Sequence, residues 1–427
     1  MSIGLQRLRD DADAIRRGVG AKGEDPAVVD RAVAVDRERR DGLARIEGMR
    51  ARRNEISSRI PQLMKQGTAA DEVERLKSES GDVGRQIRED EERLRQIEDE
   101  LDSLLLRIPN PPDPDVPVGP PSETRTIREW GEPVAHDAGG WDRKPHWEIA
   151  ERLGMIDLAA GAKVAGSGFP MYRGAGSRLQ RALIWMMLDL HASEHGMTEI
   201  WPPAVVNQDS ARGTGQIPDK EEQMYVVTRD DLYLVPTAEV PVTNIHRDEI
   251  IDASRLPVRY VAYSPCFRRE AGAAGRATRG ILRVHQFDKV EMVSFTKPDD
   301  SAGELELMTQ RAERALQQLG LAYRVRLLST GDMGFTQAKT YDIEVWAPGV
   351  QEWLEVSSVS NFRDFQARRM NIRWRPAPTE KPEILHTLNG SSLGFPRTVA
   401  ALLEVYQQPD GSVALPERLA AVAGPLT

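Results

Sequence analysis

At 427 residues the chain is too long for one ordinary hydrophobic core, so two or three domains are expected. Apolar residues make up 40% and charged residues 29%, which is typical of a soluble globular protein and excludes a disordered or fibrous one. The net charge of −9 argues against a protein that coats nucleic acid by charge alone, although it leaves room for a local basic face.

We expect neither a membrane span nor export. The longest strongly apolar stretch, residues 182–190, is far shorter than the roughly 20 residues that cross a bilayer. The first residues lack an apolar segment followed by a cleavage site of small residues. The single cysteine, Cys266, can form neither an internal disulfide nor a zinc site of the usual cysteine-rich kind, and it is expected to be a small buried residue. A cytoplasmic location without zinc is predicted.

Residues 31–105 show a helical spacing of apolar residues, with almost no aromatic residue and no strand pattern. From residue 76 onward the core positions advance in alternating steps of four and three, the spacing of a coiled-coil seam, and a matching series precedes them. The stretch 65–70 predicts a turn between two antiparallel helices, each about 45–50 Å long at 1.5 Å per residue. Pro61 is at odds with this interpretation, because a proline inside a helix should kink or end it.

The two predicted helices differ in charge. Residues 31–65 contain 10 basic and 5 acidic residues, whereas residues 71–102 contain 6 basic and 13 acidic ones. One helix could therefore face phosphates while the other faces water. The alternative is a solvated coiled coil whose charges keep it soluble and pair across the seam, which the sequence by itself favours.

A proline-rich stretch after residue 108 cannot continue a helix and predicts a domain boundary. We expect an N-terminal domain over residues 1–108 with its arm at about 27–107, a linker over 109–125 and a C-terminal domain over 126–427. That domain mixes strand-like and helical segments without regular βαβ alternation, and it lacks a P-loop or a GxGxxG signature. The fold class is α+β, with a largely antiparallel sheet flanked by helices. The expected strands are 232–236, 258–263, 284–295, 323–328 and 341–346, and the expected helices are 176–195, 298–319 and 398–407.

The densest group of reactive side chains lies between Ser264 and Glu291. The sequence begins as a strand, opens into a loop with three glycines, and returns as a strand. Arg268 and Arg269 at the root of this hairpin, with Phe287 on the return strand, suit a nucleotide, because guanidinium groups bind phosphate and an aromatic ring stacks on a base. An exposed charged hairpin is the alternative.

This stretch resembles motif 2 of class II aminoacyl-tRNA synthetases, and in detail that of the seryl-tRNA synthetases, through Phe-Arg-Arg-Glu270, Thr-Arg-Gly280 and His-Gln-Phe-Asp-Lys-Val-Glu291. Further blocks follow the family's order. These are Trp201-Pro-Pro, similar to motif 1 at the dimer interface, Pro236-Thr-Ala-Glu239, Glu352-Trp-Leu-Glu-Val-Ser-Ser358, and Leu388-Asn-Gly-Ser-Ser-Leu-Gly-Phe-Pro-Arg397, similar to motif 3. The helical pair resembles the family's tRNA-binding arm, so the resemblance covers essentially the whole chain.

The resemblance implies an ATP site. Arg268 should hold the α-phosphate, and Glu270 should accept from the adenine amino group. Phe287 and Arg397 should enclose the adenine ring, with Arg268 and Arg397 as the catalytic pair. Glu355 and Ser358 should hold Mg²⁺ together with ATP phosphates. Arg269, Val284, Val356 and Ser357 complete the implied ATP-binding set.

The resemblance also implies a pocket for L-serine. It comprises Thr237, Ala238, Glu239, Arg268, Glu291 and Ser391, in which a carboxylate suits the ammonium group and buried polar groups would be left unpaired by alanine. Each glutamate, taken singly, could instead be a surface ion pair. No residue needs to act as a nucleophile, since the carboxylate of serine is one already, and positioning and electrostatics carry the rate.

For tRNA the resemblance implies Arg276 and Arg279 in the motif 2 loop and Arg45, Arg52 and Arg53 on the arm, with plain solvent exposure as the alternative for the loop arginines. The implied protein is a homodimer that adenylates serine and esterifies tRNA(Ser), and tRNA(Sec) as a second substrate is left open. Gly394-Phe395-Pro396 departs from the Ala-Val-Gly of many relatives, so packing beside the adenine could differ. Two alternatives are a duplicate with an antibiotic-resistance role or another amino-acid specificity, and a non-catalytic tRNA-binding homologue.

Overall fold

The computed structural model describes residues 3–65, 70–271 and 279–426. It divides into two compact units, Met1–Pro109 and Asn110–Thr427, which are described separately below. Within the described residues, no helix is both long enough and apolar enough to span a membrane.

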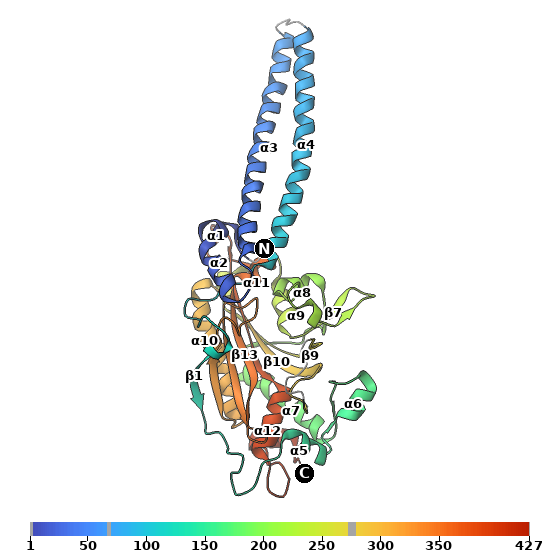
Figure 1. The fold of residues 1–427 in the computed structure, drawn as a ribbon, viewed down its shortest axis with the longest axis vertical. Helices are drawn as coiled ribbons and strands as arrows, with labels where there is room; N and C mark the ends of the chain where they lie inside the picture. Colours follow the sequence, from blue (N-terminus) through green and yellow to red (C-terminus); the bar gives the residue numbers. More distant parts are fainter. Residues whose placement is uncertain (1–2, 66–69, 272–278, 427) are drawn as a thin grey trace. The chain divides into compact units, whose positions relative to one another are not determined.

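The N-terminal unit is entirely helical. Two short helices precede two long ones that run side by side (Figure 1). At one end of the long pair, Leu8, Ile15 and Val19 pack with Leu101 and Leu105 into a small buried core, which anchors the short helices. The helices are α1 (Leu5–Asp10), α2 (Ala12–Ala21), α3 (Ala27–Lys65) and α4 (Ala70–Arg107).

The predicted helical arm is confirmed as the pair α3 and α4. Ile46 and Ile56 on one helix and Leu76 and Ile87 on the other are buried, as the four-and-three spacing requires. Helix α3 does not end at Pro61 but continues to Lys65, so the expectation that the proline stops it is wrong. A proline removes one backbone donor, and the packing of the two helices outweighs that loss. The predicted turn falls mainly on residues 66–69, which lie outside the described residues.

Ion pairs join the two arm helices along their length. Most of these side chains are half exposed, and each pair joins an arginine of α3 to a carboxylate of α4. The sequence allowed two interpretations of the charge difference between the helices, and these ion pairs correspond to the one in which charges pair across the seam. The pairs are Arg31–Glu100, Arg39–Glu98, Arg45–Asp90, Arg50–Glu91 and Arg52–Glu79.

The second unit is built on an eight-stranded sheet with the order β1-β11-β12-β13-β16-β10-β9-β4. All neighbours are antiparallel except β4, which is parallel to β9. This confirms the α+β class with a largely antiparallel sheet. The strands are β1 (Arg125–Trp130), β4 (Thr198–Ile200), β9 (Val258–Phe267), β10 (Gln286–Thr296), β11 (Tyr323–Leu327), β12 (Lys339–Ala347), β13 (Glu352–Arg363) and β16 (His386–Gly394).

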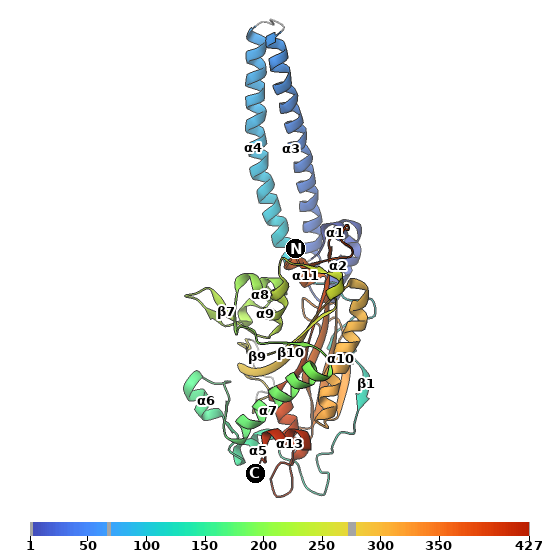
Figure 2. The ribbon, with the colours of Figure 1, turned by 180° about the vertical axis from the view of Figure 1, so that it is seen from behind.

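Helices flank this sheet. A large core joins several of them to it, and two smaller cores hold others. Figure 2 shows α7 and α10 in front of the strands, where Leu183, Met187, Met308 and Leu316 are buried. A short π-helical segment, Leu190–Glu194, follows α7. The helices are α5 (His146–Arg152), α6 (Leu158–Ala165), α7 (Ala175–Asp189), α8 (Gln208–Thr214), α9 (Glu239–Thr243), α10 (Ser301–Gln318), α11 (Phe365–Arg369), α12 (Phe395–Tyr406) and α13 (Glu417–Ala423).

Three small sheets complete the unit. They consist of β2 (Ile156–Asp157) with β3 (Met171–Tyr172), of β5 (Val205–Asn207), β7 (Leu232–Leu234) and β6 (Val226–Val227), and of β15 (Glu383–Ile384), β14 (Arg373–Arg375) and β8 (Ile250–Asp252).

The proline-rich stretch expected as a linker is bonded to the second unit. The Asn110 amide donates to the carbonyl oxygens of Thr336 and Phe362 at 3.0 and 2.8 Å, and the backbone N–H of Asp113 donates to Ala338. Prolines have no backbone N–H to donate. The polar groups between them form hydrogen bonds with the second unit instead, and these bonds fix the stretch.

Candidate active site

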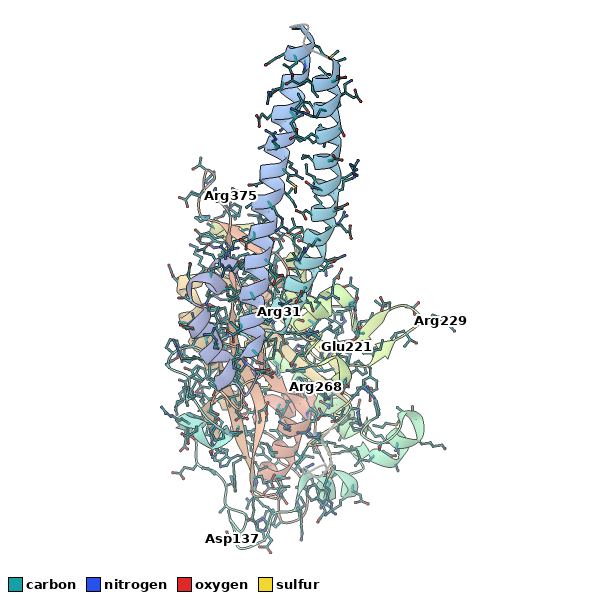
Figure 3. All side chains as sticks on the ribbon, turned by 45° about the horizontal axis from the view of Figure 1, so that its top comes forward. Arg31, Asp137, Glu221, Arg229, Arg268 and Arg375 are labelled. Atoms are coloured by element: carbon teal, nitrogen blue, oxygen red, sulfur yellow. The ribbon has the colours of Figure 1, made fainter. Side chains whose placement is uncertain are left out.

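One cavity of about 480 Å³ lies over the centre of the sheet, and β10, β13 and β16 supply much of its wall, together with residues that follow β9 and precede β10. It brings together side chains that are up to 181 residues apart in the sequence, from Gln216 to Arg397. Arg268 lies in the body of this unit, whereas Arg229 projects from the tip of the β6–β7 hairpin (Figure 3). Predicted residues in the wall are Thr237, Glu239, Arg268, Glu270, Val284, Phe287, Glu291, Glu355, Val356, Ser357, Ser358, Ser391 and Arg397.

Strand β10 places three of these side chains by alternation. Phe287, Lys289 and Glu291 all line the cavity, while Val290 and Met292 are buried in the large core on the opposite face. Successive side chains of a strand point to opposite faces, so residues two apart share one face. The strand therefore joins the predicted adenine-binding ring to the predicted serine-binding carboxylate.

Arg268 presents a guanidinium group to the predicted phosphate position. Its Nε donates to the carbonyl oxygen of Pro236 at 3.3 Å, and its guanidinium carbon lies 5.1 Å from the centre of the Phe287 ring. In the described parts of the chain, no carboxylate forms an ion pair with it. Its charge is thus available to an anionic ligand.

Glu270 is held in an unusual backbone conformation. Its φ of 51° lies in the left-handed region, which residues other than glycine rarely adopt. Its carboxylate accepts from Arg283 Nη1 at 2.7 Å, and Arg283 also lines the cavity. Arg283 was not predicted from the sequence, and it orients the carboxylate that is predicted to accept from the adenine amino group.

Arg397 lies at the first turn of α12 and is held by backbone groups. Its Nη1 donates to the Glu355 carbonyl oxygen at 2.9 Å, and its Nε donates to that of Leu282 at 3.2 Å. The unusual residues before it have clear positions. Phe395 is fully buried in the large core, and Pro396 occupies the first turn of the helix, where its missing N–H costs little. The adenine position between Phe287 and Arg397 stays a prediction.

The oxygen atoms around Glu355 and Ser358 fit a hard cation. Asp342 lies opposite Ser358 in the β12–β13 register, accepts a hydrogen bond from its hydroxyl, and carries a buried Oδ1 with no hydrogen-bond partner among the described residues. Burial, followed by the Glu355 carboxylate, raises the pKa of Asp342 well above its usual range. A divalent cation would offset both effects, and carboxylate and hydroxyl oxygens are the donors that Mg²⁺ prefers.

The predicted serine side of the cavity is a buried polar network. Lys289 Nζ lies 2.5 Å from Glu291 Oε2 and donates to Thr237 Oγ1 at 2.8 Å, and the Ser391 hydroxyl donates to Glu291 at 3.2 Å. Lys289 is only 6% exposed. Buried charges are costly unless they are paired, and this lysine is paired twice.

Glu239 begins α9 and is held by a second buried residue. Gln366 Nε2 donates to its Oε1 at 2.6 Å, and Gln366 is itself fixed by the Thr387 hydroxyl, which donates to Gln366 Oε1 at 2.8 Å. Burial and the nearby Glu291 carboxylate raise the pKa of Glu239 to about 7, while the Gln366 hydrogen bond opposes that rise.

Several predicted residues do not reach the cavity. Arg269 donates to the Glu222 carbonyl oxygen at 3.2 Å, away from the lining, because neighbours in a strand end point in opposite directions. The Ala238 methyl is in the core beside the cavity. Arg279 stacks on Trp147 at 4.6 Å, and Arg276 lies outside the described residues.

The predicted arm arginines are engaged within the arm. Arg45 and Arg52 form the ion pairs given above, and Arg53 packs over Gly84 on α4. Four further residues in or beside the cavity were not predicted from the sequence, namely Lys289, Arg283, Gln366 and Asp342. Only Lys289 had a detectable signal, its position two residues from both Phe287 and Glu291.

Two family models match this chain. The model described as "tRNA synthetase class II core domain (G, H, P, S and T)" matches residues 225–406, which include most of the cavity lining and most of the sheet. The model described as "Seryl-tRNA synthetase N-terminal domain" matches residues 3–112, which include the arm. The sheet and cavity are therefore those of a class II aminoacyl-tRNA synthetase.

Full-length relatives narrow this class. A serine–tRNA ligase of Gemmatimonas aurantiaca is 51% identical over 418 residues, 97% of both chains. The crystal structure of seryl-tRNA synthetase from Pyrococcus horikoshii complexed with ATP has a TM-score of 0.94 and 36% identity, covering 99% of this chain and 98% of that one. The crystal structure of a cytoplasmic serine–tRNA ligase from Naegleria fowleri in complex with AMP has a TM-score of 0.90 and 27% identity, covering 99% and 97%.

The chain belongs to the seryl-tRNA synthetase family. The resemblance read from its motifs is confirmed, together with the predicted fold and the prediction of an aminoacyl-tRNA ligase. Neither alternative, the altered duplicate nor the non-catalytic homologue, is favoured by these relatives.

Proposed function

We propose that this enzyme activates L-serine with ATP to seryl-adenylate and then transfers serine to the 3′ end of tRNA(Ser). The observation that carries the proposal is that the predicted ATP residues and the predicted serine residues line one cavity. A reaction between two substrates gains most from a site that holds both in contact, because their encounter no longer costs translational entropy.

The ATP half of the reaction rests on Arg268. Its guanidinium group is free of carboxylate partners among the described residues and would neutralise the α-phosphate as the serine carboxylate attacks it. Glu355, Ser358 and Asp342 would hold Mg²⁺. When bound there with ATP, Mg²⁺ neutralises charge on the phosphates. Glu270, oriented by Arg283, would accept from the adenine amino group.

The serine half rests on two carboxylates with different surroundings. Among the described residues, Glu239 has no cationic partner within hydrogen-bonding distance, and it would take the substrate ammonium group. Glu291 already binds Lys289 and Ser391 through Oε2, which leaves Oε1 to accept from the serine hydroxyl. Alanine would leave that buried oxygen without a donor, which disfavours alanine strongly.

We propose that tRNA contacts involve arm arginines other than those predicted. Arg37, Arg59, Arg75, Arg88 and Arg93 are exposed, and none of them forms an ion pair with another described residue. Free cations bind phosphates without first breaking a pair. Recognition through backbone and shape is common for RNA, and tRNA(Sec) is a second substrate to be tested.

Two further proposals concern assembly and location. Trp201 is 72% exposed and Trp185 50% exposed, and large aromatic side chains in such positions are typical of protein interfaces. We propose that Trp201, in the motif 1 block, belongs to a homodimer interface, which sedimentation equilibrium would test. A cytoplasmic location is proposed because tRNA charging takes place there.

ATP–pyrophosphate exchange tests the proposed reaction directly. Serine, alanine, glycine and threonine are each supplied to the purified enzyme, and serine should be the best substrate by at least about 100-fold in kcat/KM, as expected when a buried group loses its partner. Charging of tRNA(Ser) and tRNA(Sec) transcripts with labelled serine then tests the transfer step. A better substrate than serine, or binding of tRNA without adenylate formation, would contradict the proposal.

A further inference from the structure

Lys289 stands between the two halves of the cavity without having a role in either. It lies on β10, two residues from Phe287 and two from Glu291, and its side chain is almost fully buried. Its ammonium group contacts Thr237 and Glu291, both members of the predicted serine pocket, at 2.8 and 2.5 Å. Burying a charged lysine costs free energy, so its contacts with two residues of the pocket need an explanation.

The contact with Thr237 fixes the direction of its hydroxyl group. An ammonium group can only donate, so Thr237 Oγ1 must accept from Lys289. The same oxygen also accepts from the backbone N–H of Glu239 at 3.2 Å, which occupies its second lone pair. No described residue accepts the Thr237 hydroxyl hydrogen in return. Since Thr237 lines the cavity, that hydrogen is available to a ligand.

The contact with Glu291 balances charge in the pocket. Glu239 and Glu291 place two carboxylates in one buried region, and Lys289 supplies one positive charge. An amino acid brings a second positive charge in its ammonium group. Without Lys289 the two carboxylates would face the substrate ammonium group and Arg268, whose charge is assigned to the phosphate, and Glu291 would be a buried carboxylate with only a hydroxyl partner among the described residues.

We propose that Lys289 is a positioning residue for amino-acid binding, which makes Thr237 a hydrogen-bond donor toward an oxygen atom of the bound amino acid and holds Glu291 ready for its side chain. This inference rests on the proposed function. It also assigns the substrate ammonium to Glu239, because a hydroxyl group with both lone pairs occupied cannot accept from an ammonium group.

The test compares Lys289→Met, Thr237→Val and the double variant in ATP–pyrophosphate exchange. Loss of a hydrogen bond to a charged group predicts that Lys289→Met lowers kcat/KM for serine by about 30- to 100-fold, while KM for ATP changes by less than about threefold. Thr237→Val should lower kcat/KM for serine by about tenfold. The double variant should be no worse than Lys289→Met, because both changes remove the same donor function.

Lys339→Met is the matched control. Lys339 is a partly buried lysine on β12, is bonded to Asp115 and is absent from the cavity lining, so its loss should leave both kinetic constants within about twofold. Thermal unfolding of each variant reports on folding. Lys289→Gln, a smaller neutral donor, serves if the methionine variant does not fold, and it should retain more serine activity than Thr237→Val retains.

Three results would overturn the inference. The first is a Lys289→Met variant whose kcat/KM for serine stays within threefold of the wild-type value. The second is an equal loss of kcat/KM for serine and for ATP in that variant. The third is a double variant in which the losses of the two single variants multiply. The wild-type enzyme separates this test from that of the proposed function. If wild type shows no serine-dependent exchange, the proposed function fails, whereas an active wild type with an unaffected Lys289→Met contradicts only the role of Lys289.

Discussion

The arm and the cavity both contain many charged residues, but they use them differently. On the arm, exposed arginines of α3 pair with exposed carboxylates of α4, and such pairs contribute at most about 1 kcal/mol each. In the cavity wall, Lys289 and Glu239 are buried and hydrogen-bonded, and beside the predicted Mg²⁺ position Asp342 has a buried Oδ1 without a hydrogen-bond partner among the described residues. Burial with an unused polar atom, rather than the number of charges, is what marks a site that awaits a ligand.

The largest difference is expected between two adjacent arginines. Arg268→Gln removes a cationic donor from the cavity and should lower serine-dependent ATP–pyrophosphate exchange by about 100- to 1,000-fold, the usual effect of losing one transition-state donor. Arg269→Gln removes a guanidinium that bonds the Glu222 carbonyl oxygen outside the lining, and it should cost less than about fivefold. Similar losses of exchange activity in the two variants would contradict the prediction that Arg268, and not Arg269, acts in the cavity.

Shortening the arm should separate transfer from activation. Replacing residues 46–89 with a short Gly-Ser turn joins Arg45 to Asp90, which already face each other, and keeps the buried core formed by α1, α2 and the inner ends of α3 and α4. Charging of tRNA(Ser) should fall by more than about 100-fold as phosphate contacts are lost, while exchange stays within about twofold. Loss of exchange as well would mean that the arm supports the cavity.

Lowering the pH should weaken serine activation through Glu239. Only the ionised carboxylate attracts the ammonium group, and with a pKa of about 7 its ionised fraction falls steeply between pH 8 and pH 6. We expect kcat/KM for serine to fall about tenfold over that interval. Gln366→Leu removes the hydrogen bond that opposes the raised pKa, so the midpoint should move to higher pH. A flat profile, or a midpoint that moves to lower pH, would contradict the assignment.

The smallest effect separates free from paired arginines on the arm. Arg59→Gln with Arg75→Gln removes two cations that have no ion pair to a described residue, and the KM for tRNA should rise by about three- to tenfold with a weaker salt dependence. Arg45→Gln with Arg52→Gln removes the same charge from two paired sites and should change this KM by less than about twofold. A larger effect in the second pair would restore the originally predicted contacts.

Several long elements could be predicted from the sequence because each carries its own periodicity, but β13 and β16 were not expected, since their serine, asparagine and glycine residues weaken the strand pattern. The seam of the arm and the runs that became β9, β10, β11 and β12 are visible in a few consecutive turns or pleats. Short pieces such as α1, α2 and the two-residue strands carry too little pattern, and their stability comes from contacts with distant residues. Pro61 does not end α3, because its low helix propensity is outweighed by packing along a 39-residue helix.

The site was predictable where a motif names residues, and it was not where a role comes from a distant contact. Gln366 acts on Glu239 from 127 residues away, and Asp342 is significant only because β12 pairs with β13 beside Ser358. Arg269 was included because the family resemblance implied it, although neighbours in an extended chain point in opposite directions and its side chain lies outside the cavity. Strand alternation could have excluded Arg269 and pointed to Lys289 from the sequence.

The alternation along β10 limits how this enzyme can change. Inserting or deleting one residue within the strand would exchange its two faces, sending Phe287, Lys289 and Glu291 into the apolar core and Val290 and Met292 into the cavity. Such a change would destroy both substrate sites at once and leave no partly active intermediate. Redesign of the amino-acid specificity must therefore proceed by substitution at constant length, and a library on this strand should vary only positions 287, 289 and 291, because Val293 and Phe295 are buried in an apolar core.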